Sequence, residues 1–336
     1  MITPQTFSSS VQRAFKHRSF VAGAAIVVLL VISATVSLFW SPYPVGDIDI
    51  PNKLAGPSAQ HWFGTDSLGR DIASLLLVGS QNSLLVGFIA VGIGLGLGVP
   101  LGLLASARRG WIEEVVMRAA DFTFAFPALL SAILLTAIYG PGLVVSITAI
   151  GIFNIPVFAR ITRGAANAVW SRDFTFAFPA LLSAILLTAI YGPGLVVSIT
   201  AIGIFNIPVF AGITRGAANA VWTRDFTLAA RAAGKTKWAI TWEHVLPNVA
   251  SVLIVQATVQ FAIAILAEAA LSYLGLGTQP PNPSWGRMLN EAQSQMFQAP
   301  MLAVYPGVAI ALAVLGLNLL GDGLRDLLDP RLSRTR

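Results

Sequence analysis

The hydrophobic residues of this chain form long uninterrupted runs, with few polar positions between them. The first run, residues 20–40, contains no charged side chain and follows three basic residues, Arg13, Lys16 and Arg18. A helix needs about 20 apolar residues to cross a bilayer, so runs of this kind predict membrane-spanning helices. Eight spans are expected, at residues 20–40, 84–105, 125–139, 143–161, 177–191, 195–213, 250–271 and 302–320.

The first run also has to be distinguished from a secretory signal peptide, which shares a basic start and an apolar stretch. Residues 20–40 exceed the usual length of the apolar region of a signal peptide. They end at Phe39 and Trp40, and Ser41 and Pro42 follow without a small-residue cleavage site. We therefore expect a retained membrane anchor.

Composition agrees with this pattern. Hydrophobic residues make up 55% of the 336 positions and charged residues 11%, with a mean hydropathy of +0.74, whereas soluble proteins carry about 25% charged residues. The chain has no cysteine, which excludes disulfides, iron–sulfur clusters and thiolate metal sites. Its three histidines, His17, His61 and His244, are far apart in sequence, so no histidine metal centre is expected. This is the composition of an integral membrane protein.

The positions of the basic residues predict the orientation. If the N-terminus is cytoplasmic, the segments outside the membrane hold only Lys53, Arg70 and Arg287 of the 21 Lys and Arg residues. This asymmetry follows the positive-inside rule and predicts that both termini, 1–19 and 321–336, are cytoplasmic. The net charge of +6 is spread over several short loops, so no nucleic-acid partner is expected.

A direct repeat lies in the middle of the chain. Residues 121–172 recur as 173–224, and only two positions differ: Arg160 becomes Gly212, and Ser171 becomes Thr223. Ancient transporter repeats keep only weak similarity and are often inverted, so a recent tandem duplication explains this repeat better. Each copy holds two spans. Without one copy the chain would have 284 residues and six spans, and the orientation downstream would not change.

Residues 225–248, on the expected cytoplasmic side, read DFTLAARAAGKTKWAITWEHVLPN. Their alanines favour a helix, and Gly234 is expected to end it and to let another backbone come close. Arg231 is expected to stay solvated or to face acidic groups of a partner. Pro247, which has no amide hydrogen, is expected to stop the second part of the segment just before the next span. These features predict a helix that leaves the membrane, docks on a soluble protein and returns.

This segment resembles the EAA loop of ABC importer permeases. The matching positions are Ala229, Ala230, Gly234, His244 at a variable position, and Leu246 with Pro247. Further stretches also resemble the peptide and nickel permeases, in the same order along the chain: HWFGTDSLGRD at 61–71, LAEAALSYLGLG at 266–277, PNPSWGRML at 281–289 and GDGLRDLLDPR at 321–331. Together they resemble the C-type permease subunit of dipeptide, oligopeptide and nickel ABC importers.

The resemblance implies an all-α polytopic membrane protein with the type I ABC importer permease fold, six core transmembrane helices plus one duplicated two-helix hairpin. The implied organisation is a cytoplasmic N-terminus (1–19), a first transmembrane helix (20–40), an extracytoplasmic loop (41–83), a transmembrane domain (84–320) with the repeat 121–172/173–224 and the coupling loop 225–248, and a cytoplasmic C-terminus (321–336). The location implied is the cytoplasmic (inner) membrane.

The resemblance also implies a function, which is to form half of a translocation path for peptides or nickel. The implied partners are a homologous second permease, two ABC ATPase subunits that carry ATP and magnesium, an extracytoplasmic substrate-binding protein and membrane lipid. The chain itself is expected to be a transporter subunit with no catalytic residue, cofactor or metal of its own. Its ATPase-coupling residues would be Ala229, Ala230, Arg231, Gly234, His244, Leu246 and Pro247.

Two details of the loop need separate interpretation. Position 228 is Leu where the family usually has Glu, and this change removes a polar contact or an internal hydrogen bond. The sequence Gly234-Lys235-Thr236 imitates the end of a Walker A loop. The full pattern needs a glycine at the place of Ala229 and a strand before it, so we do not expect this chain to bind ATP itself.

Glu268 is the one carboxylate inside or at the end of a predicted span. Intramembrane carboxylates are costly and by default mark functional sites, so one interpretation places Glu268 in the translocation path. The other places it near the outer interface, where it binds helix ends. In the outer loop, Asp66, Arg70 and Asp71 are expected to stabilise local structure. Trp285 is expected to be an interfacial aromatic residue.

An ion-coupled secondary transporter is the alternative function, because the chain has an internal repeat and a carboxylate in a span. Such a transporter would need coupling-ion ligands in broken helices at matching places of its repeats, and the spans of both copies lack a carboxylate. A membrane enzyme would need paired His, Asp or metal ligands, which the sequence does not provide.

Overall fold

The computed structural model describes residues 17–108, 110–116, 185, 187, 188 and 191–328. This part of the chain is helical and contains no strand beyond an isolated bridge between Thr65 and Asp71. The elements are α2 (Arg18–Phe39), η1 (Ile50–Asn52), α3 (Ile72–Ile93), η2 (Gly94–Gly98), α4 (Val99–Ala107), α9 (Leu195–Trp222), α10 (Asp225–Ala232), α11 (Lys237–Ile240), η3 (Thr241–Val245), α12 (Leu246–Tyr273), α13 (Trp285–Ala292), η4 (Gln293–Gln295) and α14 (Met301–Leu328).

Five helical stretches of the described residues are long and apolar enough to cross a membrane: Arg18–Phe39, Ile72–Ala107, Leu195–Trp222, Lys237–Tyr273 and Met301–Leu327. The predicted all-α polytopic class is therefore confirmed. The predicted spans 125–139 and 143–161 lie outside the described residues, and so does most of 177–191.

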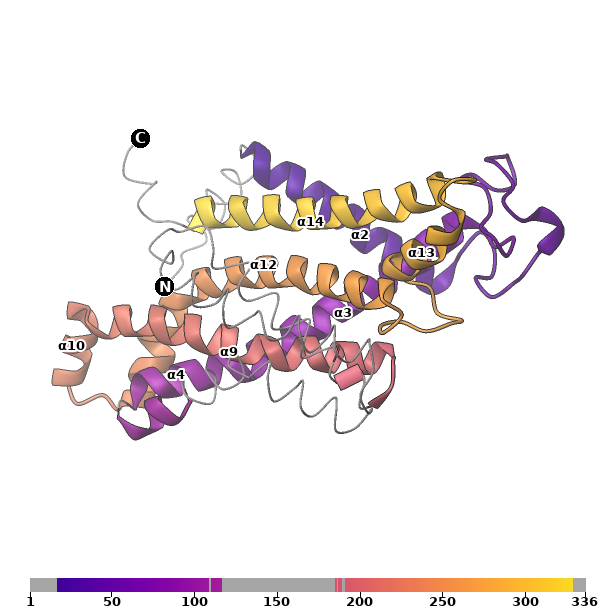
Figure 1. Ribbon diagram of the computed structural model, residues 1–336. Helices are drawn as coiled ribbons and strands as arrows, with labels where there is room; N and C mark the ends of the chain where they lie inside the picture. The colour runs from indigo at the N-terminus through magenta and orange to yellow at the C-terminus, as the bar shows by residue number, and fades with distance from the viewer. Residues whose placement is uncertain (1–16, 109, 117–184, 186, 189–190, 329–336) are drawn as a thin grey trace, which may run out of the picture.

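The long helices run side by side, with α12 among them (Figure 1). Helix α12 packs against α14, α3 and α9, and α2 packs against α14 and α3. Helix α10 lies at one end of the molecule and α13 at the opposite end (Figure 1). We refer to these as the α10 end and the α13 end.

The second long helix begins at Ile72, before the predicted span of 84–105. Residues 72–83, which were assigned to the extracytoplasmic loop, are therefore helical. The carboxylate of Asp71 caps this helix by accepting from the backbone amide and the hydroxyl of Ser74. The polar residues of the first turns also have partners from distant parts of the chain; Asn82, for example, donates to the carbonyl of Pro283 at 2.6 Å. The hydropathy pattern placed the start of the span at Leu84 because the polar run Ser80-Gln81-Asn82-Ser83 separates it from the mostly apolar residues 72–79.

The expectation that Pro247 stops the segment before the next span is wrong, because the chain is helical from Lys237 to Tyr273. A π-helical turn, η3, precedes Pro247, and in it the Leu246 amide donates to the carbonyl of Thr241, five residues back. Proline then stands in the first turn of α12, where a missing amide hydrogen is tolerated. The same arrangement occurs at η2, which is followed by Val99 and Pro100.

Helix α9 is built from the second copy of the repeat and packs in the interior. It contacts η2 and α4 through glycines of those two elements, and it contacts α3 at Ile93 through its own Gly203. A side chain at Gly94 would collide with Asn206 and Phe210, and one at Gly98 would collide with the Ile207 carbonyl. Small residues therefore allow close helix packing at these two positions, whereas a side chain at Gly92 or Gly96 would meet no atom of the described residues within 4 Å. The first copy, 121–172, lies outside the described residues.

Candidate functional site

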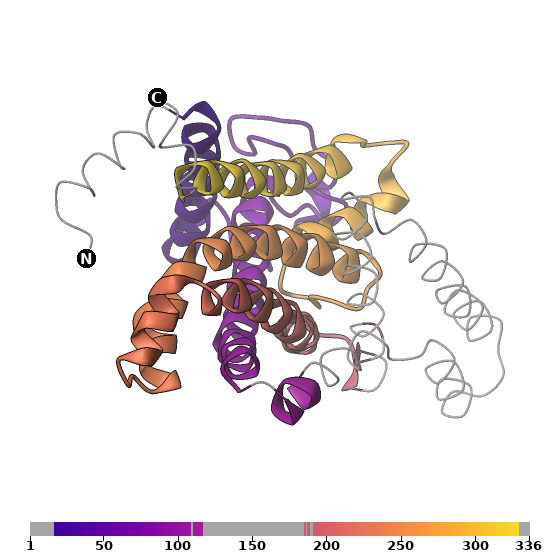
Figure 2. The ribbon, with the colours of Figure 1, turned by 90° about the vertical axis from the view of Figure 1, so that its left-hand side faces the viewer.

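Helix α10 projects at one end of the molecule, beyond the end of α9 (Figures 1 and 2). The predicted helix through the alanines is present, and α10 ends at Ala232. Gly234 has a φ of +81°, a left-handed conformation that favours glycine. A Cβ built on Gly234 meets no atom of the described structure within 4 Å. The glycine therefore turns the chain and leaves an open surface around the turn.

The corner between α9 and α10 is held by Thr227, a residue that the sequence interpretation missed. Its hydroxyl lies 2.6 Å from the carbonyl oxygen of Arg224, 3.0 Å from that of Val221 and 3.1 Å from that of Trp222. The side chain is buried. Carbonyls at a helix end have no intrahelical partner. The hydroxyl has one proton and is closest to the Arg224 carbonyl, which also accepts from the amides of Thr227 and Leu228. These bonds help to fix the angle at which α10 leaves α9. No sequence pattern marked this residue, because Thr227 lies 14 positions beyond the end of the predicted span 195–213.

The return from Gly234 leads directly into a long helix. The hydroxyl of Thr236 accepts from the amide of Ala239 and caps α11. Across the turn, Lys235 forms an ion pair with Glu243. Since α11, η3 and α12 are continuous, one helix connects the α10 end with the α13 end.

The predicted coupling residues differ in exposure. Ala229, Arg231, Gly234 and Pro247 are exposed, whereas Ala230, His244 and Leu246 are half-buried. Ala230 and Leu246 pack against the hydrophobic cluster that contains Phe210 and Val245. The His244 ring lies 6.1 Å from the ring of Phe226, which brings the two arms of the loop together. The structure thus gathers these residues at one end of the molecule, some on its surface and some beneath it.

Glu268 lies far from this loop, towards the α13 end of α12, and its side chain is completely buried. Three hydroxyls surround its carboxylate: Ser272 at 2.6 Å, Ser83 at 3.1 Å and Thr278 at 3.3 Å. Ser272 also accepts from the backbone amide of Thr278. A side chain at Gly277 would collide with Ser272. The carboxylate therefore joins α3, α12 and the loop after α12, and its place in a translocation path stays a prediction.

A second charged cluster fixes the loop before α3 to α13. Arg70 lies 2.6 Å from a carboxylate oxygen of Asp66 and 2.5 Å from one of Glu291, and Glu291 also pairs with Arg287. Burial opposes the charge on Arg70, but the two carboxylates outweigh it and raise the pKa of Arg70. The predicted local role is confirmed for Asp66, which accepts from the backbone amides of Leu68 and Arg70; Arg70 in addition holds the distant helix α13 through Glu291. The prediction for Trp285 is wrong, because Trp285 is buried and donates to the Leu76 carbonyl.

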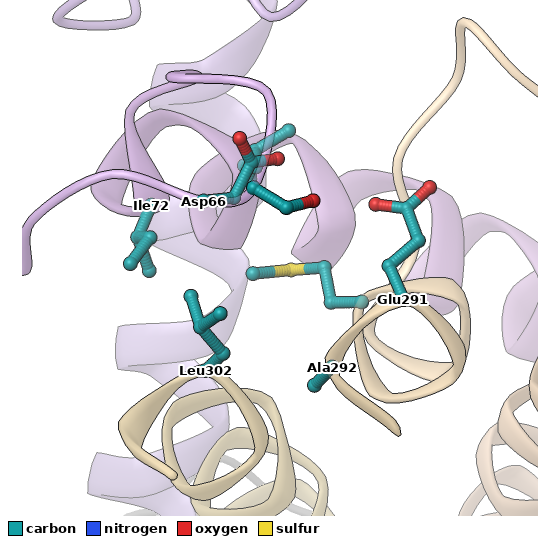
Figure 3. A pocket seen from close by; sticks show the side chains of 8 residues that line it. Asp66, Ile72, Glu291, Ala292 and Leu302 are labelled. Atoms are coloured by element: carbon teal, nitrogen blue, oxygen red, sulfur yellow. The ribbon is translucent and has the colours of Figure 1, made fainter. Parts of the chain in front are cut away.

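The described residues also form a small pocket and an open groove. One lies beside Asp66 and Glu291 and is closed by Ile72, Ala292 and Leu302 (Figure 3); its volume of about 20 Å³ has room for about one water molecule. The other is an open groove of about 470 Å³ between α3, α12 and α14, with an almost wholly apolar lining. Within the described residues, no three His, Asp or Glu side chains are grouped to hold a metal ion.

Comparison with known proteins decides the family. The family described as binding-protein-dependent transport system inner membrane component matches residues 171–334. The chain is 37% identical over 322 residues to the glutathione transport system permease protein GsiD of Pectobacterium atrosepticum, covering 96% of this chain and 90% of the relative. It is 39% identical to the GsiD of Escherichia coli O157:H7, covering 95% of this chain and 89% of the relative. This chain belongs to that family of ABC importer permeases.

The permease therefore has the type I importer fold, and it is a transporter subunit, not an enzyme. The family match begins at residue 171, so it contains the second copy of the repeat and not the first. This agrees with the position of α9 in the interior. At position 228, where the resemblance expects Glu, the permease has Leu228 on α10 with 52% of its surface exposed.

Proposed function

We propose that this permease forms half of the translocation path of an ATP-driven importer for small peptides. The glutathione permeases among its relatives support a peptide-type substrate over nickel, because glutathione is itself a small peptide. A homologous second permease would supply the other half of the path. A substrate-binding protein would deliver the peptide from outside, and two ATPase subunits would carry ATP and magnesium.

The observation that carries the proposal is the shape of the α10 end. Helix α10 projects from the bundle, exposes small residues on its surface, and turns at Gly234 into a helix that runs to the opposite end. A projecting element on a long rigid helix suits the transfer of ATPase closure to the far end of the path. We propose Ala229, Ala230, Arg231, Gly234, His244, Leu246 and Pro247 as the residues of this coupling loop.

This assignment also sets the orientation. The ATPase subunits use cytoplasmic ATP, so the α10 end would be cytoplasmic and the α13 end extracytoplasmic. The basic residues agree: Arg231, Lys235 and Lys237 lie in the projecting loop, as expected on the cytoplasmic side of the inner membrane. Both termini would then be cytoplasmic. The comparisons give the ion-coupled alternative no support.

Co-purification tests the proposal. The full permease carries an affinity tag and is expressed with the second permease and the ATPase subunits of the same transport system. We expect all subunits to purify together, and the complex to hydrolyse ATP faster when binding protein loaded with glutathione or a dipeptide is added. Purification of the permeases without ATPase subunits would contradict the proposed coupling. Stimulation by nickel-loaded binding protein, but not by peptide, would contradict the proposed substrate.

A further inference from the structure

Two tryptophans on the return arm of the coupling loop have no role so far. Trp238 and Trp242 are one helical turn apart, and 48% and 62% of their surfaces are exposed. Residues four apart share one face of a helix. Between and after them, Ile240, Thr241 and Val245 are buried, so the face with the tryptophans is directed away from the bundle. Two such side chains on one outward face need either a lipid or a protein partner.

The position of the tryptophans along the helix favours a protein partner over lipid. The predicted apolar run ends on the inner side at Ala250. A helix rises 1.5 Å per residue, so Trp242, eight residues before Ala250, lies about 12 Å beyond this end, and Trp238, twelve residues before it, about 18 Å. The headgroup layer on each side of the hydrocarbon core is only about 5 to 7 Å thick. The stretch between carries the polar residues Glu243, His244 and Asn248. Both tryptophans therefore extend past the membrane surface into the region that a soluble partner occupies.

Charge defines the chemistry of that partner. Near the tryptophans, Arg231 and Lys237 are exposed, and no carboxylate of the described residues pairs with either. A matching surface would be an apolar groove with carboxylates at its edge. We propose that Trp238 and Trp242 are the anchors by which the permease binds such a groove on its ATPase subunit. This inference rests on the proposed function and adds to it the residues that contribute most of the binding.

Buried aromatic residues at the centre of an interface are the ones that most weaken binding when they are truncated. We expect Trp238→Ala and Trp242→Ala each to weaken ATPase binding about tenfold or more, and Trp242→Phe to retain most of it. Trp111→Ala is the matched control, because Trp111 is also an exposed tryptophan but lies outside the loop. Purified ATPase subunits are titrated onto the permease pair in lipid nanodiscs, and dissociation constants are compared.

A second measurement distinguishes lipid from protein contact. The chain has no cysteine, so Trp242→Cys provides a single site for a nitroxide label. We expect the label to be accessible to a water-soluble relaxation agent, and to become protected when ATPase subunits bind. Unchanged ATPase affinity in both alanine variants would overturn the inference, as would a label accessible only to a lipid-soluble agent. Since the parent would still bind ATPase in those cases, the proposed function would stand; if the parent binds none, the proposed function itself fails.

Discussion

Replacement of Glu268 is the perturbation whose cost follows most directly from the structure. In Glu268→Ala the hydroxyls of Ser83, Ser272 and Thr278 all lose their carboxylate acceptor. Hydrogen bonds to charged groups contribute about 1.5 to 3 kcal/mol each in soluble proteins, and side-chain bonds in membrane bundles average about 0.6 kcal/mol. For three bonds at a site without solvent access, we expect a loss of about 2 to 5 kcal/mol.

The matched control is Glu268→Gln. Its amide oxygen can accept from Ser272 and Thr278, as one carboxylate oxygen of Glu268 does. Its NH₂ group can donate to the hydroxyl of Ser83 once that hydroxyl rotates. We therefore expect a loss of about 1 kcal/mol or less. The assay is unfolding of the purified permease in detergent, followed by tryptophan fluorescence.

Two results would refute this reasoning. One is a Glu268→Ala variant as stable as the parent, and the other is a Glu268→Gln variant as unstable as Glu268→Ala. The same variants also test the path interpretation. If Glu268 contacts substrate, Glu268→Gln should lose uptake while its stability stays near that of the parent. If Glu268 only joins helix ends, uptake should follow stability.

Three further predictions concern other parts of the chain. Gly234→Trp should weaken ATPase co-purification, because a large side chain blocks approach to the turn. Gly234→Asn should weaken it less, because Asn tolerates the left-handed conformation. An equal loss in both variants would assign the effect to the backbone conformation. Leu228→Glu should raise substrate-stimulated ATP hydrolysis, since a carboxylate there is within helical reach of Arg231, and an unchanged rate would show that the exposed Leu228 is harmless. Deletion of residues 121–172 should leave a 284-residue permease with uptake at least equal to that of the parent, because α9 of the second copy already packs in the interior. If the shortened protein inserts into the membrane but shows no uptake, the first copy is needed.

Features encoded by neighbouring residues could be predicted from the sequence. The long apolar runs gave the membrane class, and the alanines before Gly234 gave a helix that ends next to the turn. In each case one segment carries the whole signal, so no knowledge of distant contacts was required.

Features that depend on distant partners could not be predicted. The hydropathy pattern missed the first part of α3 because of the polar run 80–83, whose partners lie far along the chain, such as the Pro283 carbonyl for Asn82. The helix through Pro247 depends on a π turn, which hydropathy does not encode. The surroundings of Glu268 required Ser83, which is 185 residues away in sequence. Trp285 looked interfacial because tryptophan often is, yet a tertiary hydrogen bond to the Leu76 carbonyl places it inside.

The most direct test of the account is uptake into proteoliposomes that contain the permease, its partner permease and the ATPase subunits, with binding protein outside the vesicles. Labelled glutathione and a labelled dipeptide are supplied with the binding protein, and ATP is either enclosed in the vesicles or omitted. The account predicts uptake of a peptide only when ATP and binding protein are both present, with no response to an imposed proton or sodium gradient. Peptide uptake driven by an ion gradient in vesicles without ATP would contradict it.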